Sequence, residues 1–155
     1  MSLSRFYLPA EFWTVENLTL AGDEAAHCSR VLRRQVGDEV EVFDGAGRVA
    51  VGKIIALSKT FVSIQPHSQQ QHEPRQHEIH LLPAMIKAEP FEWLLEKATE
   101  LGAASVQPVI TQRTIVSHSG EHLDKKMGKC QPHINESAKQ CRASRYSGAH
   151  HPGSQ

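Results

Sequence analysis

The sequence has little cysteine and no long apolar run. Its 155 residues include three cysteines, Cys28, Cys130 and Cys141, an odd and scattered set that argues against a disulfide framework. No stretch approaches the roughly 20 apolar residues of a membrane-spanning helix, and the amino terminus has no apolar segment typical of a signal peptide. These absences predict a protein without membrane contact in a reducing compartment, with the cytoplasm as the expected location.

Net charge is lacking too, since 17 Lys and Arg balance 17 Asp and Glu. Composition therefore gives no argument for nucleic-acid binding, and any RNA site must be a local cluster of basic residues. Glycine-rich phosphate-binding motifs are absent. The one Gly-x-Gly, Gly45-Ala46-Gly47, is typical of a hairpin turn.

Ten histidines invite a search for a metal site. Cys130 and His133, together with His118, His122 or Cys141, would supply four zinc ligands. However, the two histidines of that set at 118 and 122 lie in a Ser- and Gly-containing stretch that does not favour a helix, and no second clean pair exists. We predict no metal site, and zinc binding stays a minor alternative.

The first part of the chain consists of short apolar stretches separated by turn residues, which is typical of a small β-barrel. The predicted strands are residues 5–8, 39–44, 48–57 and 60–65. Residues 24–34 are predicted to form an amphipathic helix with Asp23 as its N-cap. The run 66–76 has no apolar residue, so it cannot bury enough surface to order itself, and we place the domain boundary there.

The most strongly patterned stretch is Lys87–Gly102, which predicts a helix. Pro90 suits the first helical turn, and Gly102 suits a left-handed C-terminal position. Its inward face is predicted to comprise Phe91, Leu94, Leu95, Ala98 and Leu101. The apolar runs 79–86 and 105–110 flank it, and strand–helix–strand units build parallel sheets. A further helix is predicted over 124–142, with a kink or restart at Pro132.

This region carries motifs in the order found in one enzyme family. The motifs are Lys87 after an apolar strand, Glu96–Gly102 (EKATELG), Pro108, the Gln112–Thr114 turn and Ile134–Arg142 (INESAKQCR). The chain from about residue 5 to about residue 145 resembles the small-subunit ribosomal RNA uridine-N3 methyltransferases. These are knotted SPOUT enzymes with an N-terminal PUA-like domain.

The resemblance implies an α/β chain: a PUA-like β-barrel (1–70), a linker (71–76) and the first part of a SPOUT parallel-sheet domain (77–145). It also implies methyl transfer from S-adenosylmethionine to N3 of a uridine in small-subunit ribosomal RNA, by a homodimer. The family's cofactor knot includes a Gly-Pro-Glu-Gly-Gly-type loop that residues 143–155 do not match, so we identify no cofactor-binding residues. We therefore expect a chain that is truncated before the knot and inactive alone, with 146–155 as a disordered or foreign tail.

The basic residues of the first domain cluster at one place: Arg5, Arg30, Arg33 and Arg34. Three of them are spaced to share one helix face, and the planar guanidinium group suits phosphate oxygens. The alternative is a solvated helix end, where basic side chains favour the dipole. Because the resemblance implies RNA docking by the PUA-like domain, these arginines are candidate RNA ligands.

Two further groups are candidates in the second domain. Arg113 follows the second strand of the predicted parallel unit, where open sheets bind ligands, and it is a candidate RNA ligand or an ordinary loop arginine. Methylation at N3 requires loss of the ring proton and stabilisation of the base anion, which polar groups assist. The resemblance places Glu136, Gln140 and Arg142 beside the RNA pocket, with Arg145 as the alternative to Arg142.

A non-enzymatic hypothesis stays open beside the methyltransferase. In it the chain is an RNA-binding or interaction protein that retains the PUA-like barrel, and the arginine cluster would bind RNA with a steep dependence on salt.

Overall fold

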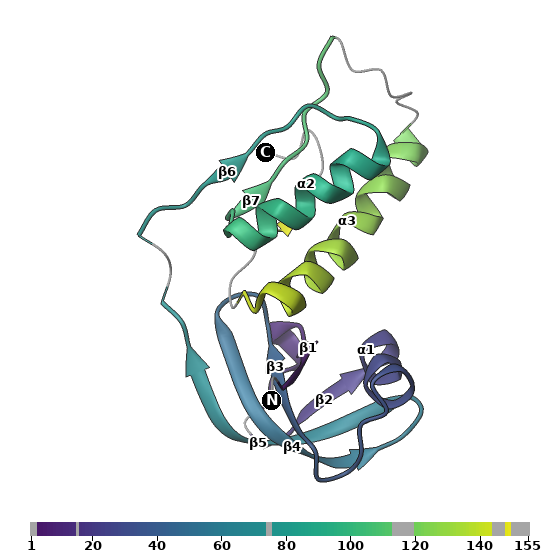
Figure 1. The fold of residues 1–155 in the computed structure, drawn as a ribbon, viewed down its shortest axis with the longest axis vertical. Helices are drawn as coiled ribbons and strands as arrows, with labels where there is room; N and C mark the ends of the chain where they lie inside the picture. Colours follow the sequence, from purple (N-terminus) through teal and green to yellow (C-terminus); the bar gives the residue numbers. More distant parts are fainter. Residues whose placement is uncertain (1–2, 15, 74–75, 113–119, 144–147, 150–155) are drawn as a thin grey trace. The chain divides into compact units, whose positions relative to one another are not determined.

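The computed structural model describes residues 3–14, 16–73, 76–112, 120–143 and 148–149, with the backbone course alone for 120–127 and 148–149. Contacts divide the chain into two compact units, residues 1–74 and 75–155 (Figure 1). We refer to them as the amino-terminal unit and the carboxy-terminal unit.

The amino-terminal unit is a five-stranded mixed sheet with the strand order β1-β3-β4-β5-β2. Its strands are β1 (Ser4–Tyr7), β2 (Leu18–Ala21), β3 (Glu39–Phe43), β4 (Arg48–Leu57) and β5 (Phe61–Gln71). β1 runs parallel to β3, and the other neighbours are antiparallel. The sheet curls, as Figure 1 shows, and β1 lies at one edge.

Alternating side chains of these strands build the core of the amino-terminal unit. The buried residues are Phe6, Leu8, Leu18, Leu20, Ala25, Cys28, Val40, Val42, Ala50, Ile54, Val62 and Ile64. Ala25 and Cys28 come from the helical segment after β2, so this segment covers the core on the side that the strands leave open.

That helical segment differs from the predicted helix over 24–34. It consists of α1 (Gly22–Ala26), followed by the π-helical turn η2 (His27–Val31). The backbone N of Leu32 donates to the carbonyl of His27 at 2.9 Å, five residues earlier, which is the π-helical pattern. Asp23 makes no side-chain cap, because the helix already begins at Gly22.

Strand β5 continues through residues that the sequence predicts to be linker. Residues 66–71 pair with β4 down to the pair Arg48 and Gln71, so backbone hydrogen bonds order a polar stretch that buries little apolar surface. The pairing shifts register beside Gly52, where an added Cβ would lie 2.5 Å from the carbonyl oxygen of Gln65. A glycine is therefore required where these two strands approach.

The carboxy-terminal unit has two helices packed on a short parallel sheet of order β6-β7-β8. Its elements are β6 (His80–Leu81), α2 (Ala88–Leu101), β7 (Ser105–Val106), α3 (Gly120–Cys141) and β8 (Gly148–Ala149). Helix α2 confirms the prediction, with Lys87 as N-cap and Gly102 left-handed at φ 77°. The flanking strands are shorter than predicted, although Ala84 and Val109 form a further parallel bridge.

Helices α2 and α3 bury a common core against the sheet. It contains Phe91, Leu95, Ala98, Ala103, Val106, Cys130 and Ile134, with Leu81 and Leu94 packed at its margin. The prediction is wrong for Leu101, which is 84% exposed in the last turn of α2. A helix that ends at the next residue turns this side chain away from the core.

Helix α3 and strand β8 depart from the predicted carboxy-terminal region. Helix α3 runs through Pro132 without the predicted restart. Residues 148–149 form a strand paired with β7, within the stretch predicted to be a disordered or foreign tail. Backbone pairing with β7 accounts for this strand.

Candidate nucleic-acid interface

The arginine segment of the amino-terminal unit begins in the π-helical turn η2. Arg30 lies within η2 and is exposed, and Arg33 follows it, also exposed, with a left-handed φ of 51°. The backbone N of Arg34 donates to the carbonyl of Cys28 at 3.1 Å. The turn thus directs two guanidinium groups to solvent on an anchored backbone.

Arg34 is held by the body of its unit. Its Nε and Nη2 donate to the hydroxyl of Ser4 at 3.0 and 2.6 Å, and its Nη1 lies 3.9 Å from Asp38. The Arg34 side chain is 35% exposed. Several N–H donors of Arg34 are therefore used by Ser4 and Asp38. A dedicated phosphate ligand would keep these donors for the phosphate.

Arg5 does not join the exposed arginines. Its Nε lies 2.7 Å from Glu41, its guanidinium stacks 4.1 Å from the centre of the Phe43 ring, and its side chain is 4% exposed. Arg5 and Glu41 are register partners in the parallel β1–β3 pair. This burial fits a structural ion pair, so we leave Arg5 out of the RNA surface proposed below.

Arg113 and Arg145 lie outside the described residues, so the structure adds nothing on their role. The other predicted group lies at the end of α3. Glu136 is exposed and 3.3 Å from the ammonium of Lys139, and Gln140 is exposed one turn later. Arg142, exposed, follows the helix with a left-handed φ of 56°. These three polar groups therefore lie in the last two turns of α3 and at the residue that follows it.

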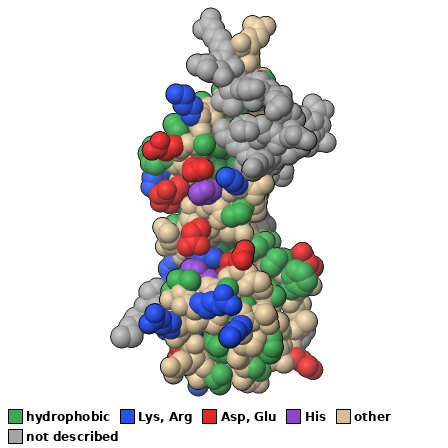
Figure 2. Space-filling model, turned by 90° about the vertical axis from the view of Figure 1, so that its right-hand side faces the viewer, with side chains coloured by type: hydrophobic (Ala, Val, Ile, Leu, Met, Phe, Trp, Pro, Cys, Tyr) green, Lys and Arg blue, Asp and Glu red, His purple; other side chains and the backbone are tan. Residues whose placement is uncertain are grey.

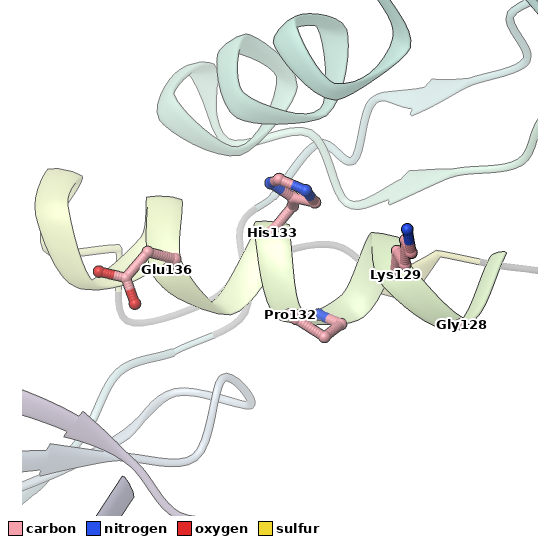
Figure 3. Close-up of a pocket in the computed structure, with 5 residues that line it drawn as sticks. All are labelled: Gly128, Lys129, Pro132, His133 and Glu136. Atoms are coloured by element: carbon pink, nitrogen blue, oxygen red, sulfur yellow. The ribbon is translucent and has the colours of Figure 1, made fainter. Parts of the chain in front are cut away.

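An open pocket of about 370 Å³ lies beside this group on α3, lined by Gly128, Lys129, Pro132, His133 and Glu136 (Figure 3). Figure 3 shows His133 pointing toward α2, where its Nε2 lies 3.7 Å from a carboxylate oxygen of Glu92. Sequence reasoning considered His133 only as a metal ligand and missed this contact between helices. The contact joins two helices, so the spacing of residues within α3 gave no signal for it.

No group of three His, Cys, Asp or Glu side chains that could hold a metal ion is found among the described residues. Cys130 lies in the core while His133 is exposed, so the two point apart. Within the described part of the chain, no helix is long and apolar enough to cross a membrane.

Charges on α2 pair among themselves. Lys97 lies 2.9 Å from Glu96 and 3.0 Å from Glu100, and these hydrogen bonds raise the pKa of Lys97, while the same bond from Lys97 lowers the pKa of Glu96. Figure 2 shows Lys and Arg side chains exposed beside hydrophobic ones on one face of the amino-terminal unit. Arg30 and Arg33 are exposed, and no ion pair of either is found among the described contacts.

Comparison with known families matches both units. Residues 20–66 match an RNA methyltransferase PUA domain, and residues 72–152 match an RNA methyltransferase domain. The chain belongs to this RNA methyltransferase family. The family match extends to residue 152, so it includes strand β8 of the predicted tail.

Curated relatives of this RNA methyltransferase chain carry the name ribosomal RNA small subunit methyltransferase E. The Synechocystis protein is 33% identical over 70% of this chain and 35% of its own length. The Bacillus subtilis protein is 26% identical over 79% of this chain and 48% of its own length. The chain therefore spans between about a third and a half of these relatives.

Solved structures confirm the predicted fold class, a PUA-like domain followed by a SPOUT-type α/β domain. A putative methyltransferase from Legionella pneumophila, in complex with S-adenosylmethionine, aligns with a TM-score of 0.88 and 27% identity, over 98% of this chain and 63% of that one. The Neisseria gonorrhoeae small subunit methyltransferase E, bound to S-adenosylmethionine, aligns with a TM-score of 0.82 and 21% identity, over 97% and 62%.

Proposed function

We propose that this chain takes part in methyl transfer from S-adenosylmethionine to N3 of a uridine in small-subunit ribosomal RNA, in the cytoplasm. The observation that carries the proposal is the order of the two matched domains, an RNA methyltransferase PUA domain followed by an RNA methyltransferase domain. The names of the curated relatives support ribosomal RNA as the substrate. The resemblance in the motifs of α2 and α3 supports uridine N3 as the acceptor atom.

On the amino-terminal unit, Arg30 and Arg33 are the proposed RNA ligands. Both are exposed, and neither forms an ion pair with a carboxylate among the described contacts. A guanidinium that is free toward solvent forms bidentate hydrogen bonds with phosphate oxygens. Arg34 supports the segment through Ser4, and Arg113 is a further proposed ligand on the strength of its position after β7.

On the carboxy-terminal unit, Glu136, Gln140 and Arg142 are the proposed substrate-side residues. N3 of uridine must lose its proton, and the anion that forms spreads over the ring nitrogen and its neighbouring carbonyl oxygens. Arg142 would stabilise that anion, and Gln140 would orient the ring by hydrogen bonds. Glu136 would accept the proton, directly or through water, since its partner Lys139 lies at 3.3 Å and leaves acceptor capacity on the carboxylate.

S-adenosylmethionine would supply the methyl group, but the lining of the α3 pocket does not fit it. The α3 pocket is lined by five residues of a single helix, among them Lys129, His133 and Glu136. A nucleoside cofactor requires a largely apolar, enclosed pocket with a few placed polar groups. We therefore assign no residue and no step to cofactor binding.

A homodimer is part of the proposal, and the outer face of α2 is the surface that suits it. Trp93 is 63% exposed and Leu101 is 84% exposed on this helix. Eight residues apart, they lie on one side of α2, with Lys97 between them. Large apolar side chains exposed on one helix face are typical of protein contacts.

The test combines cofactor binding and RNA binding by the isolated 155-residue chain. Calorimetric titration with S-adenosylmethionine tests whether the chain alone carries out the transfer: heat of binding supports methyl transfer, and no heat leaves RNA binding without catalysis. We expect small-subunit ribosomal RNA to bind with a steep salt dependence that the double variant Arg30→Gln/Arg33→Gln reduces. Micromolar cofactor binding would show that the chain holds a cofactor site, and methyl groups found on another uridine atom would refute N3 specificity.

A second function, RNA binding without catalysis, is favoured by one observation, the exposed arginine segment on an anchored backbone. It predicts the same RNA binding with no methyl incorporation. Detection of 3-methyluridine by nucleoside mass spectrometry, in cells that lack this modification and express the chain, separates the two functions.

A further inference from the structure

We propose that residues 30–36 of the amino-terminal unit bind an unpaired RNA strand, with arginine side chains on phosphates and aliphatic side chains against the bases. The inference rests on the RNA binding proposed above and adds the form of RNA that this surface takes. It also separates the arginines of the segment into those that contact RNA and one that positions them.

The segment exposes apolar and cationic side chains side by side. Val31 is 67% exposed, Val36 is 62% exposed and Leu32 is 38% exposed, and exposed Arg30 and Arg33 lie next to Val31 and Leu32 in the chain. A single exposed aliphatic residue is ordinary on a protein surface. Three within six consecutive residues, with arginines among them, indicate a surface built for a ligand that is both charged and apolar.

The backbone of the segment is fixed at several points. Leu32 and Arg34 donate backbone hydrogen bonds into η2, at 2.9 and 3.1 Å. Gly37 donates to the carbonyl of Ile54 on β4 at 2.8 Å. The exposed side chains therefore stand on a pre-organised loop, which lowers the entropy lost on binding.

Two side chains complete this anchoring. The Asp38 carboxylate accepts a hydrogen bond from the backbone N of Gln35 at 3.0 Å. Arg34 donates twice to Ser4 on β1. We assign Arg34 as a positioning residue, because its contacts are with the protein.

Arg33 stands in a conformation that favours glycine. Its φ of 51° is left-handed, a region that L-residues other than Asn and Asp rarely adopt. The side chain is exposed, so burial does not offset this strain. Strain of this kind is retained where the side chain has a function, and an exposed guanidinium beside exposed aliphatic groups is suited to the RNA backbone.

Exposed bases distinguish an unpaired strand from a duplex. A duplex presents phosphates and hydroxyls while its bases stay stacked, so Val31 and Val36 would find no base face to cover. An unpaired strand exposes those base faces, so it matches the apolar groups that lie among the arginines.

The test is fluorescence anisotropy of the 155-residue chain with two RNA probes. One is a labelled strand without self-complementarity, and the other is the duplex that this strand forms with its complement. We expect the single strand to bind at least about tenfold more tightly than the duplex.

Variants assign the contacts. Arg33→Gly relieves the strained φ, so the fold keeps its stability while single-strand affinity falls about threefold to tenfold and the salt slope falls by about one. Val31→Ser with Val36→Ser is expected to weaken single-strand binding by at least about threefold, without change in duplex binding. Lys59→Gln, in the β4–β5 turn, and Ile79→Ser, 64% exposed in the carboxy-terminal unit, are the matched controls and leave both affinities unchanged.

Equal binding of strand and duplex would overturn the inference and leave the proposed RNA binding intact. The same holds if only Arg33→Gly has an effect, since the bases would then lie away from Val31 and Val36. If neither probe nor small-subunit ribosomal RNA binds, both the inference and the RNA binding of this unit are refuted.

Discussion

Arg48 folds back onto Asp44 across the turn between β3 and β4. Its side-chain Nε lies 3.1 Å from one carboxylate oxygen, and its backbone N donates to the other at 2.9 Å. The backbone N of Ala46 donates to that same oxygen at 2.7 Å. The predicted Gly45–Gly47 hairpin turn is therefore confirmed, and a carboxylate that is 1% exposed holds it together.

Replacing Asp44 by Ala should lower the free energy of unfolding by about 2–3 kcal/mol, because two backbone N–H groups lose their acceptor in a partly buried turn. Arg48→Ala is the comparison: its side chain is 43% exposed. Its loss should therefore cost less than about 1 kcal/mol. Urea denaturation followed by circular dichroism measures both, and equal losses would contradict the role given to the backbone donors.

Replacing Gly52 and Gly128 by alanine should change the free energy of unfolding in opposite directions. Gly52→Ala places a Cβ 2.5 Å from the carbonyl oxygen of Gln65 and 2.8 Å from Ile64, so the β4–β5 pair must separate. We expect a loss of about 2–4 kcal/mol in the free energy of unfolding. Gly128→Ala on α3 meets nothing within 4 Å. It should gain about 0.5–1 kcal/mol through helix propensity. Denaturant unfolding measures the free energy of unfolding of both variants. A wild-type value for Gly52→Ala would contradict the prediction.

The thiol of Cys28 should be inert in the folded protein. Burial raises its pKa from 9.0 to about 11. Iodoacetamide at pH 8 should therefore alkylate exposed Cys141 and spare Cys28, as peptide mass spectrometry will show. Between pH 9 and 11 the unfolded thiol ionises first, so the stabilisation by Cys28 is lost as pH rises through this window. The difference in free energy of unfolding between wild type and Cys28→Ala should shrink over this pH range. A constant difference would contradict the raised pKa of Cys28.

The proposed dimer should depend on the outer face of α2. Trp93→Glu with Leu101→Glu adds charge to two side chains that are already exposed, so folding is preserved while self-association is lost. Sedimentation velocity measures the change. Ile110→Glu, 47% exposed after β7, is the control and should keep the wild-type mass. A monomeric wild-type chain would refute the dimer.

Local signals account for what the sequence predicts well. Helix α2 is predicted almost to the residue, because Pro90, the spacing of Phe91 and Leu95, and Gly102 all act within the helix. Strand β3 follows from its alternation of apolar and polar residues, and β4 follows from the apolar stretch after the Gly45–Gly47 turn. Both features require no knowledge of what packs against them.

The missed features depend on partners that lie far apart in the sequence. Strand β5 extends to Gln71 because β4 offers hydrogen bonds, which a polar composition does not reveal. Arg5 is buried because the parallel pairing of β1 and β3 brings it to Glu41 and Phe43. Of the candidate site, the exposure of Arg30 and Arg33 could be foreseen, whereas the support of Arg34 by Ser4 could not.

Pro132 has a consequence for the dynamics of α3. Proline has no amide hydrogen, so one rung of the i to i−4 ladder is missing between residues 128 and 132. The later half of the helix keeps Ile134 and Ala138 buried. Opening of the earlier half therefore need not disturb the later half. In native-state hydrogen exchange, the amides before residue 132 should exchange as one cooperative group and faster than those after it.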